Sequence, residues 1–584
     1  MIVSRLLLAT SCLVLFTSCT SQADLQLAQQ PAAVEPAAAP AATPPEQWQD
    51  VNDVSGLVSG YLRALIAEGQ GDAAEAAKGY AQVTKANPEN TDMLYRALSM
   101  QLASGEIPAA TKVAHQLLAL DEQVTPTVQL LLIADAVKNG DFTTAQNYLA
   151  KLRAQEDDLL PFEALAAYLA LAQGQEVETV VQTLKDFPIA EGQEAEKNYH
   201  IGRIYEQAGD LKTALQYYAQ GFILNPTYLP LIARLGNLYE HQGEFNKAVE
   251  LYKTFDELKP SSALFAGAQS NALAKKVGPK ESFSPQSNVG EVMFSLANIM
   301  IGQESFLMAE QFLQLARYLR PQDVYIPFYQ GIIAEHEQDF TRAADFYRDI
   351  PENSGLGVAA RLRTAQTLAA AKKDDEAVAV LANMIKRGEK VDLARQSIAE
   401  IHYNQKDYAK AVEYYNVLLQ NPPKEMTKRE AALYFARGTA FERLKQFDKA
   451  ERDIEKSLSI FPDNAVALNY IGYMLVDLKL DQKRGKRYIE QALALKPYDG
   501  SIIDSLGWAY YHEGNYQEAL AHLERAATLL PADPTVTEHL GDVYYKQGRL
   551  DEAKTQWLRA LRLEPDEPSI RRNIEQKIQS LQAH

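Results

Sequence analysis

Two stretches near the carboxyl end of the chain decide the fold. Residues 504–531 read DSLGWAYYHEGNYQEALAHLERAATLLP, and residues 538–565 read EHLGDVYYKQGRLDEAKTQWLRALRLEP. The second stretch repeats the pattern of the first after 34 residues, with glycine, tyrosine, alanine and proline at matching places. A period of this length is typical of stacked pairs of helices. A length of 584 residues would by itself suggest several separate domains. A repeating chain is instead expected to form one array of stacked repeats.

The period extends over most of the chain. A small residue marks the middle of the second helix of each expected pair, mostly 34 or 35 residues apart, at Ala76, Ala110, Ala145, Val180, Ala214, Ala248, Ala309, Ala343, Ala377, Ala411, Ala450, Gly485, Ala519 and Ala553. Twelve or thirteen residues earlier the clearest pairs have a glycine, at Gly202, Gly236, Gly331, Gly438, Gly472, Gly507 and Gly541. Helix backbones approach closely only where small residues lie between them. We therefore expect these glycines to be structural positions where the two helices of a pair cross.

This pattern of glycine, aromatic, alanine and proline positions resembles the tetratricopeptide repeat. The resemblance implies an all-α fold, a right-handed α-solenoid of about fourteen helical hairpins with a superhelical groove. Residues 48–262 form the N-terminal repeat region, partly degenerate because the pairs around Ala110, Ala145 and Val180 match less well. Residues 290–566 form the C-terminal repeat region, and residues 567–584 are expected to be a capping helix.

One interval in the period is much longer than the rest. Ala248 and Ala309 are 61 residues apart, which indicates an insertion at residues 263–289. This insertion is interpreted either as a surface loop or one extra helix, or as a lid or partner contact.

The first residues are typical of a secreted lipoprotein. Residues 1–18 combine one positive charge, an apolar run and small residues, as a signal peptide does. The stretch FTSC at residues 16–19 resembles a bacterial lipobox, which implies cleavage before Cys19 and acylation of that residue, for example with palmitate. The alternative is ordinary cleavage after Ala23. Residues 19–47 are rich in Ala, Pro and Gln and predict a disordered tether.

The cysteine content also supports the interpretation of the chain as a lipoprotein. The two cysteines are Cys12 and Cys19, so the mature chain would contain a single thiol and no internal disulfide. Stable membrane anchoring needs more than one acyl chain, which a lipoprotein cysteine carries. Thr20 follows Cys19 where an Asp would indicate retention in the inner membrane, so the resemblance implies the periplasmic face of the outer membrane.

The sequence contains no pattern that predicts catalysis. Its histidines lack metal-ligand spacing, no glycine-rich phosphate loop is present, and the Ser-Leu-Gly of residues 505–507 is explained by the helix crossing. The net charge of -18 argues against nucleic acid as a partner. We therefore expect a protein that is not an enzyme and that has no cofactor, no metal and no nucleic-acid partner.

The remaining candidate site is the groove. In the tetratricopeptide family, the side chains three residues before and one, four and five residues after the crossing glycine point into it. This resemblance implies a partner-binding groove formed by Asn469, Tyr473, Asp504, Trp508, Tyr511, His512, Glu538, Asp542 and Tyr545. Aromatic and polar side chains together suit protein binding. Alternatively, Tyr511 and Tyr545 pack partly between repeats, and Trp508 is a half-buried helix residue.

The predicted function is that of a noncatalytic scaffold anchored to the outer membrane. Long lipoproteins of this kind resemble the adaptor of a periplasmic carboxyl-terminal processing protease, which implies that the chain assembles this protease with cell-wall hydrolase substrates for proteolysis. The alternative is a scaffold lipoprotein of an exopolysaccharide export or pilus assembly complex. The sequence does not distinguish between these functions.

Overall fold

The computed structural model describes residues 51–584 apart from 122, 156–158, 260–261, 564–567 and 583–584. Over these residues it contains 30 α-helices and no strand. The signal peptide predicted at 1–18, Cys19 and the tether at 19–47 lie outside the described residues. The chain forms two compact units, unit 1 up to Val391 and unit 2 from Asp392.

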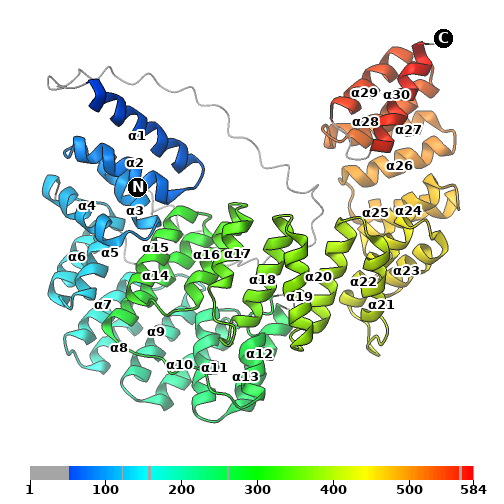
Figure 1. Ribbon diagram of the computed structural model, residues 1–584. Helices are drawn as coiled ribbons and strands as arrows, with labels where there is room; N and C mark the ends of the chain where they lie inside the picture. Colours follow the sequence, from blue (N-terminus) through cyan, green and yellow to red (C-terminus); the bar gives the residue numbers. More distant parts are fainter. Residues whose placement is uncertain (1–50, 122, 156–158, 260–261, 564–567, 583–584) are drawn as a thin grey trace. The chain divides into compact units, whose positions relative to one another are not determined.

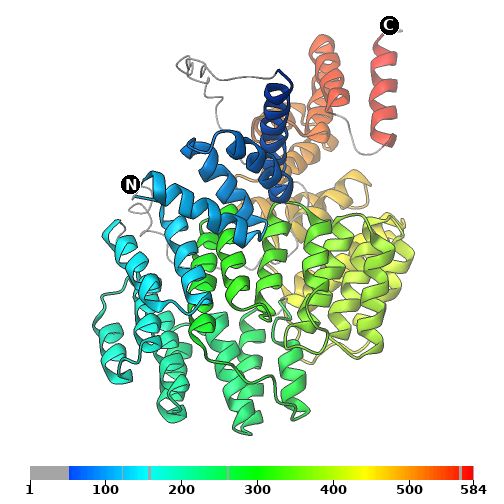
Figure 2. The same ribbon diagram turned by 60° about the vertical axis from the view of Figure 1, so that its left-hand side comes forward.

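Unit 1 consists of helix pairs and one additional helix (Figures 1 and 2). We call the first helix of each pair the A helix and the second the B helix. The pairs are α1 (Val51–Gly69) and α2 (Ala73–Ala86), α3 (Thr91–Ala103) and α4 (Ile107–Leu120), α5 (Pro126–Lys138) and α6 (Phe142–Gln155), α7 (Leu160–Ala172) and α8 (Val177–Asp186), α9 (Glu194–Gln207) and α10 (Leu211–Leu224), α11 (Leu229–His241) and α12 (Phe245–Leu258), α14 (Pro285–Gly302) and α15 (Phe306–Leu319), α16 (Tyr325–His336) and α17 (Phe340–Arg348), and α18 (Gly357–Ala370) and α19 (Asp374–Lys386). The additional helix is α13 (Ala266–Leu273).

Unit 2 continues the pattern and ends in a single helix. Its pairs are α20 (Val391–Asn404) and α21 (Tyr408–Leu418), α22 (Lys428–Arg443) and α23 (Phe447–Ile460), α24 (Ala465–Asp477) and α25 (Gln482–Leu495), α26 (Gly500–His512) and α27 (Tyr516–Leu529), and α28 (Pro534–Lys546) and α29 (Leu550–Arg562). The last helix is α30 (Pro568–Gln582). The described residues thus form fourteen pairs, and the small residue that marks each period lies in the B helix, so the predicted α-solenoid is confirmed.

The glycines of the A helices lie against buried side chains of their B helices. A Cβ atom added to Gly331 would lie 2.5 Å from the ring of Tyr347, and one added to Gly507 would lie 2.7 Å from Leu523. The same geometry occurs at Gly202, Gly236, Gly438, Gly472 and Gly541, where the nearest side chains are Tyr218, Tyr252, Ile454, Ile489 and Trp557. Each of these side chains lies four residues after the small residue of the B helix. Glycine thus leaves room for a large side chain at the crossing.

A recurring set of polar contacts links each of several pairs to the next. Tyr218 of α10 donates to Glu206 of α9 at 2.9 Å, and Arg234 of α11 donates to the same carboxylate at 2.7 Å. Glu335, Tyr347 and Arg363 repeat this arrangement. Because Glu206 and Arg234 are both buried, this ion pair is protected from solvent screening. The contacts hold successive A helices in register.

The second half of unit 1 packs on the first half. Helices α14 and α15 contact α3, α5 and α7, as Figure 1 shows. Gln311 of α15 donates to the Ser99 hydroxyl of α3 at 2.7 Å, and Tyr318 donates to Asp135 of α5 at 3.2 Å. The period alone predicts neighbouring pairs that stack one after another. The chain instead turns back after α12, because residues 259–284 interrupt the period there.

Candidate protein-binding surfaces

The A-helix face of α9 and α11 binds an extended segment of the same chain. We call residues 274–284, between α13 and α14, the strap. Its Gly278 amide donates to Glu240 at 3.2 Å, and its Pro279 carbonyl accepts from the Asn237 amide group at 3.2 Å. Asn237 and Glu240 lie one and four residues after the crossing Gly236, at positions expected to face the groove. The strap therefore uses main-chain groups to bind this face.

Two side chains of the strap bind Arg203 of α9 and Arg234 of α11. Glu281 lies 3.3 Å from the guanidinium of Arg203 and 3.6 Å from that of Arg234. The ring of Phe283 lies 5.2 Å from Arg203 Cζ and 5.5 Å from Arg234 Cζ, within the range of a cation–π contact. Arg203 is only 1% exposed, so the strap and its neighbours cover it almost fully. One anionic and one aromatic side chain thus fix the strap.

Glu291 of helix α14 supplies a negative charge beside the buried arginines Arg203 and Arg320. Burial raises the pKa of Glu291, but the charges of Arg320 and Arg203 and the 2.8 Å hydrogen bond from Tyr199 lower it to about 2. Glu291 is therefore ionised and offsets the buried arginines, which is the condition for burying charged groups at tolerable cost.

In unit 2 the predicted residues Trp508, Tyr511 and His512 form one aromatic cluster on α26. The rings of Trp508 and Tyr511 stack with centroids 4.6 Å apart, and the His512 ring meets Trp508 edge-on at 4.9 Å. His539 of α28 stacks on Trp508 with centroids 3.9 Å apart. Trp508 is 9% exposed, so most of its surface packs between repeats. Tyr511 and His512 are half-buried and line its exposed edge.

Asp504 binds the imidazole that covers Trp508. Its carboxylate oxygens each lie 3.0 Å from His539 Nδ1. Burial lowers the pKa of His539, but the charge of Asp504 and its hydrogen bond, together with the charges of Asp542 and Glu538, raise it overall. The Trp508 indole donates to Asp477 of α24 at 2.9 Å. These contacts join α24, α26 and α28.

The predicted carboxylates of α28 are bound by the last helix. Lys577 of α30 lies 2.7 Å from Glu538 and 2.7 Å from Asp542. Asp542 also accepts from the Trp557 indole at 2.9 Å, and Glu538 accepts from Asn573 at 3.2 Å. These two carboxylates therefore hold the capping helix in the described structure.

The other predicted residues lie on α24 and at the end of α28. Asn469 and Tyr473 are half-buried, and Asn469 Oδ1 has no hydrogen-bond partner among the described residues. Tyr545 is 41% exposed, with its ring centroid 5.7 Å from that of Trp557. The structure thus brings Tyr473, Trp508 and their neighbours together through His539, whereas Tyr545 packs beside Trp557.

Sequence reasoning missed His539, Asp477 and Lys577, and it marked the insertion at 263–289 without predicting the contacts of the strap with α9 and α11. For His539 a signal existed, because it lies two residues before Gly541. The same position holds Arg234 before Gly236 and Tyr470 before Gly472, and both bind a carboxylate 28 residues earlier in the chain. A search for polar residues in this period would have marked His539 as a contact between repeats.

Comparison with known families agrees with this geometry. Models described as tetratricopeptide repeat match residues 61–123, 205–272, 362–425, 431–464, 483–535 and 510–574. The chain is a tetratricopeptide-repeat protein. This explains the glycines at the crossings of its A and B helices, and it makes the A-helix faces the surfaces on which protein partners are expected.

One relative and two solved structures are similar to parts of this chain. The TPR repeat-containing protein PA4667 of Pseudomonas aeruginosa is 32% identical over 196 residues, which cover 33% of this chain and 32% of the relative. The match thus spans about a third of that relative's length. The crystal structure of the APC/C hetero-tetramer Cut9-Hcn1 is similar over 83% of this chain and 96% of that chain, with 15% identity and a TM-score of 0.35. A tetratricopeptide repeat protein from Parabacteroides merdae is similar over 49% of this chain and 97% of its own, with 16% identity and a TM-score of 0.34.

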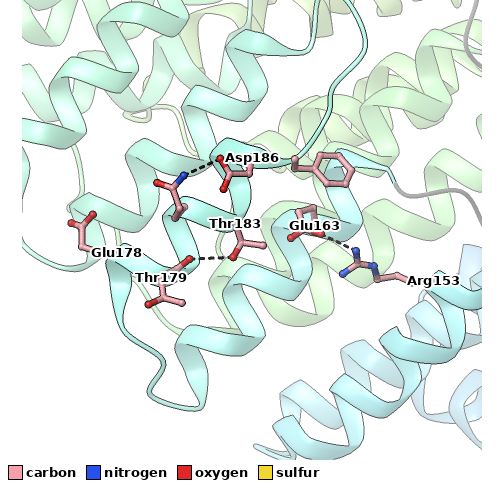
Figure 3. A pocket seen from close by; sticks show the side chains of 8 residues that line it. Arg153, Glu163, Glu178, Thr179, Thr183 and Asp186 are labelled. Carbon is pink, nitrogen blue, oxygen red and sulfur yellow. Dashed lines mark hydrogen bonds and ion pairs between the residues drawn. The ribbon is translucent and has the colours of Figure 1, made fainter.

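A hollow among α6, α7 and α8 of this repeat protein is lined by polar side chains that bind one another (Figure 3). Arg153 and Glu163 form an ion pair at 3.0 Å, and Gln182 donates to Asp186 at 2.9 Å. Glu178 accepts from Tyr205 at 3.1 Å. Small-molecule sites are mostly apolar with a few convergent polar groups, whereas polar side chains of this hollow are bonded within the chain.

Two kinds of feature are absent from the described part of the chain. It contains no group of three or more His, Cys, Asp or Glu side chains that could hold a metal ion. No helix in that part of the chain is long and apolar enough to cross a membrane.

Proposed function

We propose that this tetratricopeptide-repeat protein is a noncatalytic scaffold that binds other proteins on its A-helix faces. The observation that carries the proposal is the strap on α9 and α11. It supplies an extended segment whose main chain binds Asn237 and Glu240 and whose side chains bind Arg203 and Arg234. A partner protein with a segment of suitable chemistry can use the same kinds of contact on the A-helix faces of unit 2.

We further propose that the scaffold is lipid-anchored at Cys19 on the periplasmic face of the outer membrane. There it would bring a carboxyl-terminal processing protease together with cell-wall hydrolases. Holding two proteins on one body raises their effective concentration to the millimolar range. The signal-peptide pattern, the lipobox-like residues and the resemblance of the whole layout to such adaptors support this proposal.

The partner test is an affinity purification of the tagged, full-length chain from gently solubilised envelopes, followed by mass spectrometry. Copurification of a protease with cell-wall hydrolases would support the adaptor function. Copurification of exopolysaccharide-export or pilus-assembly proteins without a protease would replace it by the alternative scaffold. Activity of the purified chain alone on peptidoglycan or peptides would refute a noncatalytic role.

A matched pair of variants shows whether the A-helix face is responsible. Tyr511→Ala with Tyr545→Ala changes two accessible side chains of the face, whereas Trp508→Ala would also open the core of unit 2. Tyr498→Ala is the control, because Tyr498 is 81% exposed in the turn before α26. We expect partner recovery to fall in the double variant and to stay unchanged in the control, with both variants folded.

The anchoring test is separate. Cys19→Ser should abolish incorporation of labelled palmitate and release the chain from the membrane fraction. Retention in the outer membrane without the label would exclude the lipid anchor and leave the partner-binding proposal untouched.

A further inference from the structure

Helix α1 carries three large apolar side chains that the described structure leaves exposed. Val58, Leu62 and Ile66 are 52%, 52% and 59% exposed and follow one another at intervals of four residues, so they form one stripe along the helix. We call these three residues the α1 stripe. No other helix in the described part of the chain exposes three large apolar side chains at this spacing. Single exposed apolar residues are ordinary, whereas a continuous stripe indicates a contact surface.

The opposite face of α1 packs closely on α2. A Cβ atom added to Gly79 of α2 would lie 2.7 Å from the Ala64 methyl group and 2.8 Å from the Gly60 carbonyl oxygen. Each later A helix of unit 1 follows another pair, whereas α1 is the first helix in the described part of the chain (Figure 1). The α1 stripe therefore lies at the end of the array of repeats, on the side that α2 leaves uncovered.

The last helix of the chain shows what a solvent-facing end of such an array contains. Terminal repeats of a solenoid need a polar outer face to remain soluble. The exposed side chains of α30 are all polar: Arg571, Arg572, Asn573, Glu575, Gln576, Gln579 and Ser580. The α1 stripe departs from this rule, so we expect another surface to cover it.

The exposed face of α1 is not acidic, although the chain has a net charge of -18. Over residues 57–69 the charged side chains are Arg63 and Glu68. The Glu68 carboxylate is already bound, because it accepts from Arg96 at 2.9 Å. Arg63 is exposed and directly follows Leu62 in the sequence. An apolar stripe beside an exposed cation suits a surface that is apolar inside and anionic outside, as a lipid bilayer is.

The α1 stripe also lies close in the sequence to the proposed lipid anchor. Residues 20–50 separate Cys19 from α1, and even fully extended they span at most about 100 Å. An anchor at Cys19 therefore keeps the bilayer within reach of α1. Under this condition a contact that is too weak to bind by itself is sufficient, because the connection raises the effective concentration of one surface at the other.

The stripe is too small to hold a second copy of the chain by itself. A stable interface buries about 800 Å² on each partner, contributed by about 20–30 residues. The stripe supplies three side chains, each of which is already about half buried. The same area is adequate for a membrane contact, because the acyl chains of an anchored cysteine already supply the affinity.

We propose that the α1 stripe lies in the surface of the bilayer to which Cys19 is anchored. The three apolar side chains enter the boundary between headgroups and acyl chains, and the Arg63 guanidinium donates to lipid phosphate groups. The contact holds α1 along the membrane and thereby sets the direction in which the first repeats face. This inference rests on the proposed lipid anchor and adds a second membrane contact within the folded chain.

The test uses the full-length lipoprotein, purified from envelopes and reconstituted in vesicles of phosphatidylethanolamine and phosphatidylglycerol. Ser59→Cys places a thiol on an exposed position beside the stripe and leaves the stripe unchanged. A nitrobenzoxadiazole group attached to this thiol reports contact with lipid. The unmodified chain, treated with the same reagent, gives the background from Cys19. We expect a blue shift of the emission on reconstitution, and quenching by lipids that carry a doxyl group near the headgroup.

A variant with all three stripe residues changed to serine, carrying the same reporter, should lose both the blue shift and the quenching. The matched control changes Leu120, Leu224 and Leu258 to serine, since these are exposed leucines near the ends of B helices in unit 1. We expect the control to keep both signals. Because the changed side chains are exposed, circular dichroism should show the same unfolding midpoint for the two variants.

The inference would be overturned by a reporter that doxyl lipids do not quench, or by quenching that persists in the stripe variant. Oxidative cross-linking of Leu62→Cys between two copies, without quenching by lipid, would assign the stripe to a second copy instead. A chain that does not float with the vesicles would refute the lipid anchor together with this inference. A chain that floats without quenching would reject only the membrane contact of α1.

Discussion

The ring of Trp508 on α26 stacks against the ring of His539 on α28, with centroids 3.9 Å apart and planes inclined by 12°. Asp504 holds the same imidazole through both carboxylate oxygens. One histidine thus connects the A helices of two successive repeats. Because a protonated imidazole strengthens both contacts, its titration is coupled to the stability of unit 2.

The free energy of unfolding of unit 2 should therefore decrease as the pH rises above about 6.5, the ordinary pKa of histidine. The pKa of His539 is raised in the folded chain: burial lowers it, but Asp504, Asp542 and Glu538 outweigh burial. A group whose pKa is raised on folding stabilises the fold fully below its unfolded pKa and loses this effect as the pH passes its folded pKa. Denaturant unfolding followed by tryptophan fluorescence measures the effect, because Trp508 and Trp557 both lie in unit 2.

His539→Gln is the control for this titration. The difference in unfolding free energy between the unmodified chain and the variant should shrink as the pH rises. His512 contributes in the opposite sense and at lower pH, because burial lowers its pKa. A difference that stays constant from acidic to alkaline pH would show that His539 is neutral throughout.

Gly331→Ala should destabilise unit 1 by about 1–3 kcal/mol, the usual cost of overpacking a core. The new methyl group would lie 2.5 Å from the ring of Tyr347, which is 1% exposed and bonded to Glu335 at 2.7 Å. This clash exceeds the gain of up to about 1 kcal/mol that alanine brings to a helix. Gly302→Ala is the control, since a Cβ there has no neighbour within 4 Å. Thermal unfolding should show a lower midpoint for Gly331→Ala only.

The period of the sequence was sufficient to predict the pairs of helices, for a physical reason. A glycine such as Gly507 and a small residue such as Ala519 are local requirements of each crossing, and both can be read without knowing the rest of the fold. The capping segment at residues 567–584 was likewise marked by its position after the last period. Its contact through Lys577 was not predicted, because that contact depends on how α30 meets α28.

The reversal in unit 1 and the exposure of the site residues depend on distant contacts. Gln311 and Ser99 are 212 residues apart, and no local pattern brings them together. The resemblance predicts that Trp508 faces a partner, and the structure places it on the A helix α26. Its small exposed fraction results from His539 in the next repeat, a contact that the spacing of one A helix cannot reveal.

Lys577→Met should destabilise unit 2 by about 1–3 kcal/mol, because it leaves two nearly buried carboxylates without their cation. Glu538 and Asp542 are 7% and 8% exposed, and each lies 2.7 Å from the Lys577 ammonium. Methionine keeps the packing of the stem, so the loss reports the charge. Lys546→Met on α28 is the control, since Lys546 is exposed. Denaturant midpoints that fall equally in both variants would contradict a specific role for Lys577.

Glu281→Gln combined with Phe283→Ala should release the strap from α9 and α11. The double change removes the anion between Arg203 and Arg234 and the ring that lies over both guanidinium groups. Trypsin cuts a segment only when it detaches from its surroundings, so its rate reports local opening. The strap contains three lysines, at 275, 276 and 280, as cleavage sites.

We expect cleavage in the strap to become about tenfold faster in the double variant, which corresponds to a loss of about 1.4 kcal/mol of local stability. Ser282→Ala is the matched control, because Ser282 lies between the two altered residues and is exposed. Mass spectrometry of the fragments locates each cut. Equal cleavage rates in the double variant and the control would mean that Gly278 and Pro279 hold the strap through their main-chain contacts with Glu240 and Asn237 alone.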